Sequence, residues 1–285
     1  MRKTLFSGIA ACLLATAATA AEQSPSVIWT VGQADRSASE FALAPDRFRD
    51  FLANDFGYED KYFLVGHSVP AADFPYVLPG PADTWGGTWP TSGWRTHQVN
   101  ILFGLKEIPS DGTCTLVVDL LDYAKNFLPL VKVSVNTQDA KFQLDAPGLS
   151  VADQRKPNQM EKIVDTLSIT GNLAKATPRR LEIPIRPGVL KAGGNEVTIT
   201  VLEGSWILFD RVSLEGPAGT NVEQPQQLFI RNIEAAPYEL ADGKRRVQPL
   251  LVDLEWLEGA PALSVELDGK EILNQPVSYT HLTLP

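Results

Sequence analysis

In residues 195–202, Asn195-Glu-Val-Thr-Ile-Thr-Val-Leu202, apolar and polar side chains alternate along the whole stretch. Because successive side chains of a strand point to opposite faces, Val197, Ile199 and Val201 share one face and the polar residues between them share the other. This period of two indicates a strand with one buried face and one solvated face, as antiparallel sheets have. The stretch therefore predicts a β fold.

The same pattern recurs along the first three quarters of the chain. Apolar, β-branched and aromatic residues form short runs separated by Gly, Pro, Asn and Asp, which predicts strands joined by turns. The predicted strands are 96–105, 114–121, 131–136, 181–185, 196–203 and 207–214. Their spacing is typical of a sandwich, so we predict an all-β fold.

Only residues 44–53 have convincing helical spacing. Pro45 suits a first helical turn, and Phe48, Phe51 and Leu52 lie on one helical face. We therefore expect a single short helix beside the sandwich. Two long connections, 68–94 and 147–180, are where a binding surface is expected, because long loops in compact domains are often functional.

A Pro/Gly-rich segment at 217–225 predicts a linker between two domains, 21–216 and 226–276. The second domain has predicted strands at 227–234, 248–257, 262–267 and 270–273, with Leu267-Asp-Gly-Lys270 as a tight hairpin turn. Four strands are too few to close a sandwich. We therefore expect an immunoglobulin-like or fibronectin-like β-sandwich of which only the start is present.

Both ends of the chain are predicted to lie outside the fold. Residues 1–20 contain a basic pair, an apolar core and the small residues Ala18-Thr-Ala20, after which we expect cleavage. This pattern indicates a signal peptide and a secreted or periplasmic protein. A lipid anchor on Cys12 is the alternative. Residues 277–285 resemble the translation of a sequencing-library adapter, and we exclude them from the fold prediction.

The charge of the chain excludes some classes of partner. Its 285 residues contain 25 Lys and Arg against 34 Asp and Glu, a net charge of -9. Nucleic acid and anionic membranes would repel such a chain, so neither is an expected partner. No later stretch approaches the roughly 20 apolar residues that span a bilayer, so no membrane span is expected. Cys114, within an apolar run, is predicted to be a core thiol.

Several short motifs occur in a fixed order between residues 27 and 215, and no one of them is specific alone. The motifs are Ile28-Trp-Thr-Val-Gly-Gln-Ala-Asp35, Tyr62-Phe-Leu-Val-Gly66, Val133-Ser-Val-Asn136, Gly193-Gly-Asn195 and Gly204-Ser-Trp-Ile-Leu-Phe-Asp210. Together they resemble the carbohydrate-binding-module-like third domain of family 4 polysaccharide lyases, the rhamnogalacturonan lyases. The resemblance implies a galactose-binding-like jelly roll. It also implies a polysaccharide as partner and a catalytic domain elsewhere in the parent chain.

The order of domains differs from that of those lyases, in which this domain follows the catalytic domain. Here it follows the predicted signal peptide directly, an order that resembles large secreted proteins with an α-mannosidase-like glycosidase downstream. The parent is therefore expected to be a polysaccharide lyase or a glycoside hydrolase.

Carbohydrate binding is predicted for the aromatic segment 75–97. Indole rings can stack on the C–H face of a pyranose, while polar side chains hold its hydroxyls. The alternative is that the rings pin a long Pro/Gly-rich loop onto the sandwich. The candidate residues are Trp85, Trp89, Trp94, Tyr76, Asp83, Arg95 and His97.

A structural calcium ion is the one cofactor considered, and none is required. Asp35, Glu40 and Asp210 supply carboxylate oxygens of the kind that Ca²⁺ prefers, and the first and last strands of jelly-roll modules lie close together. The alternative is that Asp210 caps or turns the chain.

No catalytic residue is predicted. His67 and His97 lack metal-ligand spacing, and the chain has no Gly-x-Ser-x-Gly motif. We therefore expect a non-catalytic carbohydrate-binding or accessory module. Two alternatives stay open: lyase activity in this chain itself, and a structural spacer or adhesion module without a ligand.

Overall fold

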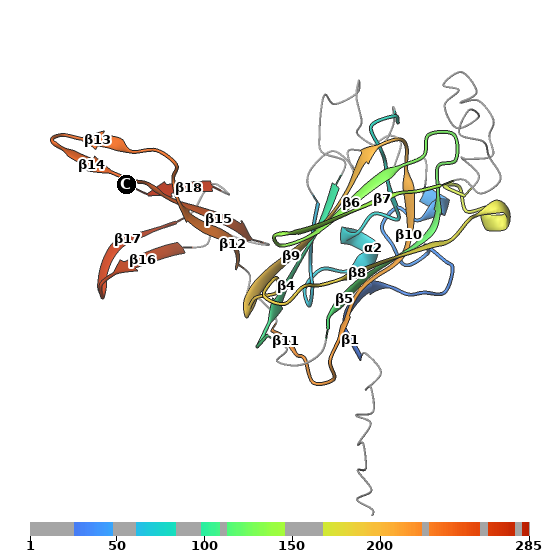
Figure 1. Cartoon of the computed structure of the whole chain (residues 1–285), viewed down its shortest axis with the longest axis horizontal. Coiled ribbons are helices and arrows are strands. Elements are labelled where there is room, and N and C mark those ends of the chain that lie inside the picture. Colours follow the sequence, from blue (N-terminus) through green and yellow to red (C-terminus); the bar gives the residue numbers. More distant parts are fainter. Residues whose placement is uncertain are drawn as a thin grey trace, which may run out of the picture.

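The computed structural model describes residues 26–47, 61–83, 98–108, 113–145, 168–223, 228–256, 262–276 and 281–284. Almost all regular structure in these ranges is β-strand, which confirms the predicted all-β class (Figure 1). The sandwich contains β1 (Ser26–Gly32), β2 (Lys61–Leu64), β3 (Val77–Leu78), β4 (Gln98–Leu105), β5 (Thr115–Tyr123), β6 (Leu130–Val135), β7 (Gln138–Gln143), β8 (Arg179–Pro184), β9 (Gly193–Glu203), β10 (Ile207–Gly216) and β11 (Val222–Glu223).

Two sheets form the sandwich. Sheet 1 has the order β1-β10-β5-β8, with β3 paired to β10. Sheet 2 has the order β11-β4-β9-β6-β7, with β2 paired to β4. All neighbours are antiparallel except β2 and β4, which run parallel. The first strand, β1, lies beside the last long strand, β10, as the resemblance to jelly-roll modules implies.

The hydrophobic core lies between the two sheets. In β9, Val197, Ile199 and Val201 are buried and the polar residues between them are partly exposed, so the predicted alternation is confirmed. Along β4 every residue from Val99 to Leu105 is buried, because both faces of this strand are covered. Cys114, directly before β5, is a buried free thiol, as predicted.

The structure describes only the start of the helix predicted at 44–53, and it contains two short helical elements elsewhere. A 3-10 turn, η1, covers Pro45–Arg47, and the rest of the predicted helix lies outside the described residues. Two short elements occur in the predicted irregular connections: α2 (Pro70–Asp73) and η3 (Leu173–Lys175). Periodicity cannot find elements of three or four residues, because they complete barely one helical turn. No helix in the described part of the chain could cross a membrane.

Two asparagines join the β6–β7 turn to the start of β9. Asn136 has a positive φ of 48°, and its side-chain oxygen accepts the backbone N–H of Glu196 at 2.9 Å. Its amide nitrogen donates to the side-chain oxygen of Asn195 at 2.9 Å. Asn195 is buried and also bonds the backbone of Lys191 and Gly193. The motifs around these asparagines therefore define a structural junction.

A second unit follows the sandwich and consists of three small sheets (Figure 1). Its strands are β12 (Leu228–Ala235), β13 (Leu240–Asp242), β14 (Arg245–Val247), β15 (Leu250–Trp256), β16 (Ala262–Leu267), β17 (Lys270–Pro276) and β18 (His281–Leu284). The predicted hairpin turn is present between β16 and β17, where Asp268 and Gly269 both have positive φ. Strand β18 pairs with β15 in a segment that we had excluded from the fold.

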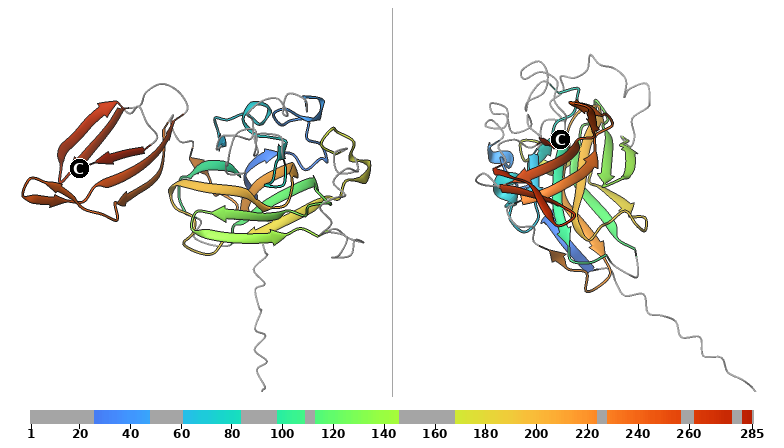
Figure 2. Two further views of the ribbon diagram at one scale, coloured as in Figure 1. Left: turned by 90° about the horizontal axis from the view of Figure 1, so that it is seen from above. Right: turned by 90° about the vertical axis from the view of Figure 1, so that its left-hand side faces the viewer.

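Phe229 connects the second unit to sheet 2. Its ring is buried in a small cluster with Leu64 and Leu102, against which Tyr62 packs. A Cβ at Gly194 would lie only 2.9 Å from the Cζ of Phe229, so the ring lies directly on the glycine backbone of β9. The two units, which lie beside each other in Figure 2, thus share one apolar contact.

Candidate functional site

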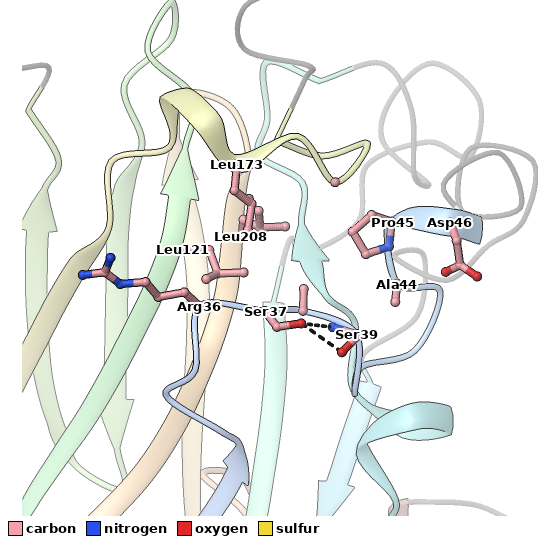
Figure 3. Close-up of a pocket in the computed structure, with 11 residues that line it drawn as sticks. Arg36, Ser37, Ser39, Ala44, Pro45, Asp46, Leu121, Leu173 and Leu208 are labelled. Carbon is pink, nitrogen blue, oxygen red and sulfur yellow. Dashed lines mark hydrogen bonds between the residues drawn. The ribbon is translucent and has the colours of Figure 1, made fainter.

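A pocket of about 420 Å³ lies beside β5 and β10 of sheet 1 (Figure 3). One wall is the connection 36–46 that follows β1, and the other is the turn around Gly171 that leads into η3. The lining residues are Arg36, Ser37, Ala38, Ser39, Ala44, Pro45, Asp46, Leu121, Gly171, Leu173 and Leu208.

An aromatic cluster anchors the first wall. The buried ring of Phe41 lies 5.6 Å from the ring of Phe74, which in turn lies 5.8 Å from Phe63 and 5.1 Å from Phe209. A Cβ at Gly32 would collide with the Phe41 ring at 2.3 Å, and the φ of this glycine is +80°. Only glycine allows the chain to turn so close to that ring. The cluster therefore fixes where the wall begins.

Asp210 holds the same wall at a second point. One of its carboxylate oxygens accepts the backbone N–H of Arg36 at 3.0 Å. Arg36 has a φ of 64°, a conformation that costs energy for any residue with a side chain. Burial raises the pKa of Asp210 to about 6 against the effect of that hydrogen bond, and the nearby charge of Asp35 acts in the same direction as burial. The sandwich therefore holds Arg36 in a strained backbone conformation.

Side chains from the sandwich also hold the second wall. The hydroxyl of Tyr76, which is fully buried, donates to the backbone oxygen of Ile169 at 3.1 Å. Ser168 donates to Asp122 at 2.6 Å. At the rim, a Cβ at Gly171 would lie 3.1 Å from Pro45, so the two walls approach each other there.

The pocket combines apolar and polar surface. Figure 3 shows Leu121, Leu173 and Leu208 grouped between Arg36 on one side and Asp46 on the other. Ser37 and Ser39 lie along one wall, and the hydroxyl of Ser37 donates to that of Ser39 at 2.9 Å. Apolar surface with a few convergent polar groups is typical of small-molecule sites. Such a pocket suits a ligand with both C–H and hydroxyl groups.

The predicted sugar-binding residues fall into two groups. Trp85, Trp89, Trp94, Arg95 and His97 lie outside the described residues. Tyr76 and Asp83 are both buried inside the sandwich. We had expected them at a sugar-binding surface, but Tyr76 positions the Gly171 wall from below.

Asp83 fastens the end of the segment that precedes the predicted aromatic loop. Its carboxylate accepts the backbone N–H of Gly80 at 2.7 Å and the hydroxyl of Ser205. Ser205 belongs to the connection between β9 and β10. The contacts tie residues 80–83 to that connection and leave Asp83 8% exposed.

Because Asp83 is buried, we expect the folded chain to lose stability as the pH rises towards neutrality. Burial raises the pKa of Asp83 to about 7 from 3.8, so between these values the folded state holds a proton that the unfolded state has released. The stabilisation is present below about pH 4 and is lost as the pH rises through about 7. Melting temperatures measured from pH 4 to 8 should fall, and Asp83→Asn should flatten the curve. An equally steep curve in Asp83→Asn would show that Asp83 is not the source of the pH dependence. A smaller slope should remain in this variant, because the pKa of Asp210 is also raised.

The three carboxylates proposed to hold calcium are each engaged by a backbone N–H. Asp35 accepts from Ser37 at 2.9 Å, Glu40 accepts from Gln33 at 2.9 Å, and Asp210 accepts from Arg36. Across the ranges that the structure describes, no group of three or more acidic, His or Cys side chains is placed to hold a metal ion. The structure shows these residues shaping the turn after β1.

The pocket residues themselves were missed by the sequence analysis. Arg36, Ser37 and Ser39 lie between Asp35 and Glu40. The sequence analysis selected this segment for its carboxylates, as a possible calcium site, and not for its pocket residues. Leu121 and Leu208 look like ordinary strand residues in the sequence. The available signal was the cluster of short polar residues directly after a strand that ends in glycine.

A comparison with protein-family models agrees with this fold. Residues 27–214 match the sequence model of one family, described as CBM-like, polysaccharide lyase family 4, domain III. The chain belongs to this family, as its motifs had indicated. No curated protein matches the chain. Among solved structures, it is similar to a family GH115 4-O-methyl-α-glucuronidase with specificity for decorated arabinogalactans, at 15% identity and a TM-score of 0.26. That match covers 42% of this chain and 13% of the glucuronidase.

Proposed function

We propose that this chain is a non-catalytic carbohydrate-binding module of a secreted polysaccharide-degrading enzyme, and that it binds glycan in the pocket beside β5 and β10. The observation that carries the proposal is the pocket's composition: an apolar group of leucines bordered by two hydroxyls and two charged side chains. A sugar offers C–H groups to apolar surface and hydroxyls to polar groups, so one pocket can bind both. Membership of a CBM-like family supports the same function.

The aromatic segment belongs to the proposal as an extension of the site. Asp83 fastens the chain immediately before residues 84–97, which contain Trp85, Trp89 and Trp94. Stacking of a second sugar on one of these rings would lengthen the binding surface. The parent enzyme is proposed to be a rhamnogalacturonan lyase-like or α-mannosidase-like protein. The module would hold that enzyme on its polymer.

The test is a binding screen with the intact chain. Affinity electrophoresis in gels that contain rhamnogalacturonan or mannose-containing polymers should show retardation on at least one polymer class. The screen is repeated with calcium chelated, which tests whether binding requires a structural calcium ion. A folded chain that no polymer retards would overturn the binding function and favour the spacer. New absorbance from an unsaturated product, formed by the chain alone on a uronate polymer, would instead favour the lyase alternative.

Removing both pocket hydroxyls should weaken binding. In the double variant Ser37→Ala, Ser39→Ala, two hydrogen bonds to sugar hydroxyls are lost, each worth about 1 kcal/mol, so we expect affinity to fall by about tenfold or more. Titration calorimetry with the polymer found in the screen measures this. Ser264→Ala, at an exposed serine of β16, is the matched control and should bind normally. Unchanged affinity of the double variant would place the glycan elsewhere.

A further inference from the structure

The segment between the sandwich and the second unit is held on sheet 2 by its backbone. Strand β11, Val222–Glu223, pairs antiparallel with Leu105 and Gly104 at the end of β4. Only residues 224–227 separate β11 from β12, the first strand of the second unit. The second unit therefore begins a few residues after a strand of sheet 2.

Two glycines of sheet 2 provide the space for this connection and for the second unit. Gly104 of β4 and Gly194 of β9 are partners in the sheet register, so side chains at these positions would point to the same face. At Gly104, a Cβ would collide with the backbone oxygen of Glu223. At Gly194, a Cβ would lie 2.9 Å from the Cζ of Phe229 and 3.3 Å from the backbone oxygen of Ile230. Neither glycine has a positive φ, so the contact depends on the missing side chains and not on backbone freedom.

Leucines beside the glycines complete an apolar site for Phe229. Leu64 and Leu102 are buried, but they belong to the small cluster with Phe229 and not to the core between the two sheets. They therefore lie on the outer face of sheet 2. Phe229 itself is 4% exposed, and its strand β12 lies beside β9 (Figure 1). A buried aromatic ring in an apolar pocket is a common anchor of protein interfaces.

We propose that the outer face of sheet 2 around Gly104 and Gly194 is a docking site for the second unit of the same chain, with Phe229 as its anchor. Two units joined by a small interface usually move relative to each other. Full burial of one phenylalanine is enough to favour the docked state by about ten- to a hundredfold. The sandwich and the second unit then move as one body. The described residues that line the pocket all belong to the sandwich, so the docking site and the pocket are separate.

NMR relaxation of the backbone amides of the intact chain tests whether the two units tumble together. In the docked state, the amides of both units have one rotational correlation time. A free second unit would have a correlation time at least about twofold shorter than that of the sandwich, because it is much the smaller of the two. Two separate correlation times in the unchanged chain would overturn the proposal.

Variants on both sides of the contact link the docking to this site. Phe229→Ala removes the anchor, and Gly104→Ala places a methyl group where the backbone oxygen of Glu223 lies. Both should shorten the correlation time of the second unit far more than that of the sandwich. Ile233→Ala, at an exposed side chain of the same strand as Phe229, is the matched control and should keep one shared value. A shared value in either Phe229→Ala or Gly104→Ala would overturn the docking site as assigned.

The same spectra show whether each variant folds. Dispersed amide signals from both units identify a folded chain. Because Gly104→Ala changes no residue of the second unit, it tests docking even if Phe229→Ala unfolds that unit. No glycan is present in these measurements, so their outcome is independent of the proposed carbohydrate-binding function.

Discussion

Asn195→Ala should destabilise the sandwich by about 3–5 kcal/mol, a large part of the 5–15 kcal/mol that typically separates folded from unfolded states. The Asn195 side chain accepts from the backbone N–H of Lys191 at 2.8 Å and from Asn136 at 2.9 Å. It also donates to the backbone oxygens of Lys191 and Gly193. Since Asn195 is only 2% exposed, water cannot easily replace these four bonds.

Urea unfolding followed by tryptophan fluorescence measures the loss. Five of the six tryptophans lie before residue 217, so the signal reports mainly on the sandwich. Asn221→Ala is the matched control, because the side chain of Asn221 makes one exposed bond to Gly219; its expected effect is within about 0.5 kcal/mol. A loss below about 1 kcal/mol in Asn195→Ala would show that the junction between the β6–β7 turn and β9 is dispensable.

The strands that were predicted could be found because each has a recognisable local sequence pattern. Strand β9 alternates apolar and polar residues, and Leu267-Asp-Gly-Lys270 has the turn chemistry that a two-residue hairpin requires. Short edge strands such as β7 and β13 were missed, since they have few apolar residues and owe their structure to pairing with a neighbour. Strand β18 was missed because residues 277–285 were excluded from the fold prediction for their resemblance to a translated adapter. Strand β15, the partner of β18, is distant in sequence, so a local pattern cannot find that pairing.

The sequence predicted the region of the candidate site but not the residues that line it. Asp35, Glu40 and Asp210 pointed to the turn after β1, but their carboxylates bind backbone N–H groups and shape the wall. Tyr76 was expected to face a sugar and instead supports the Gly171 wall from inside. A sequence shows which residues have useful chemistry; whether a side chain faces a pocket or the core depends on which strands are neighbours in the sheet.

Phe74→Ala should cost about 3–5 kcal/mol and should also weaken glycan binding. Phe74 is 1% exposed and contacts three other rings, so its removal leaves a large cavity. One of those rings belongs to Phe41, which anchors the wall of the pocket that carries Arg36 and the two serines. The backbone oxygen of Phe74 accepts the N–H of Ala42 at 2.9 Å, so the same region holds the wall through its main chain.

A second buried phenylalanine separates the two effects. Phe103 of β4 is equally buried but belongs to sheet 2, where its ring lies 5.2 Å from Trp29. Phe103→Ala should lose a similar amount of stability, because the cavity is similar in size. Binding is then measured for both variants at a temperature where each is fully folded. If the aromatic cluster positions the pocket, Phe74→Ala binds glycan more weakly than Phe103→Ala. Equal binding would mean that the wall keeps its shape without the Phe74 ring, held by Asp210 and by the main-chain bond from Ala42.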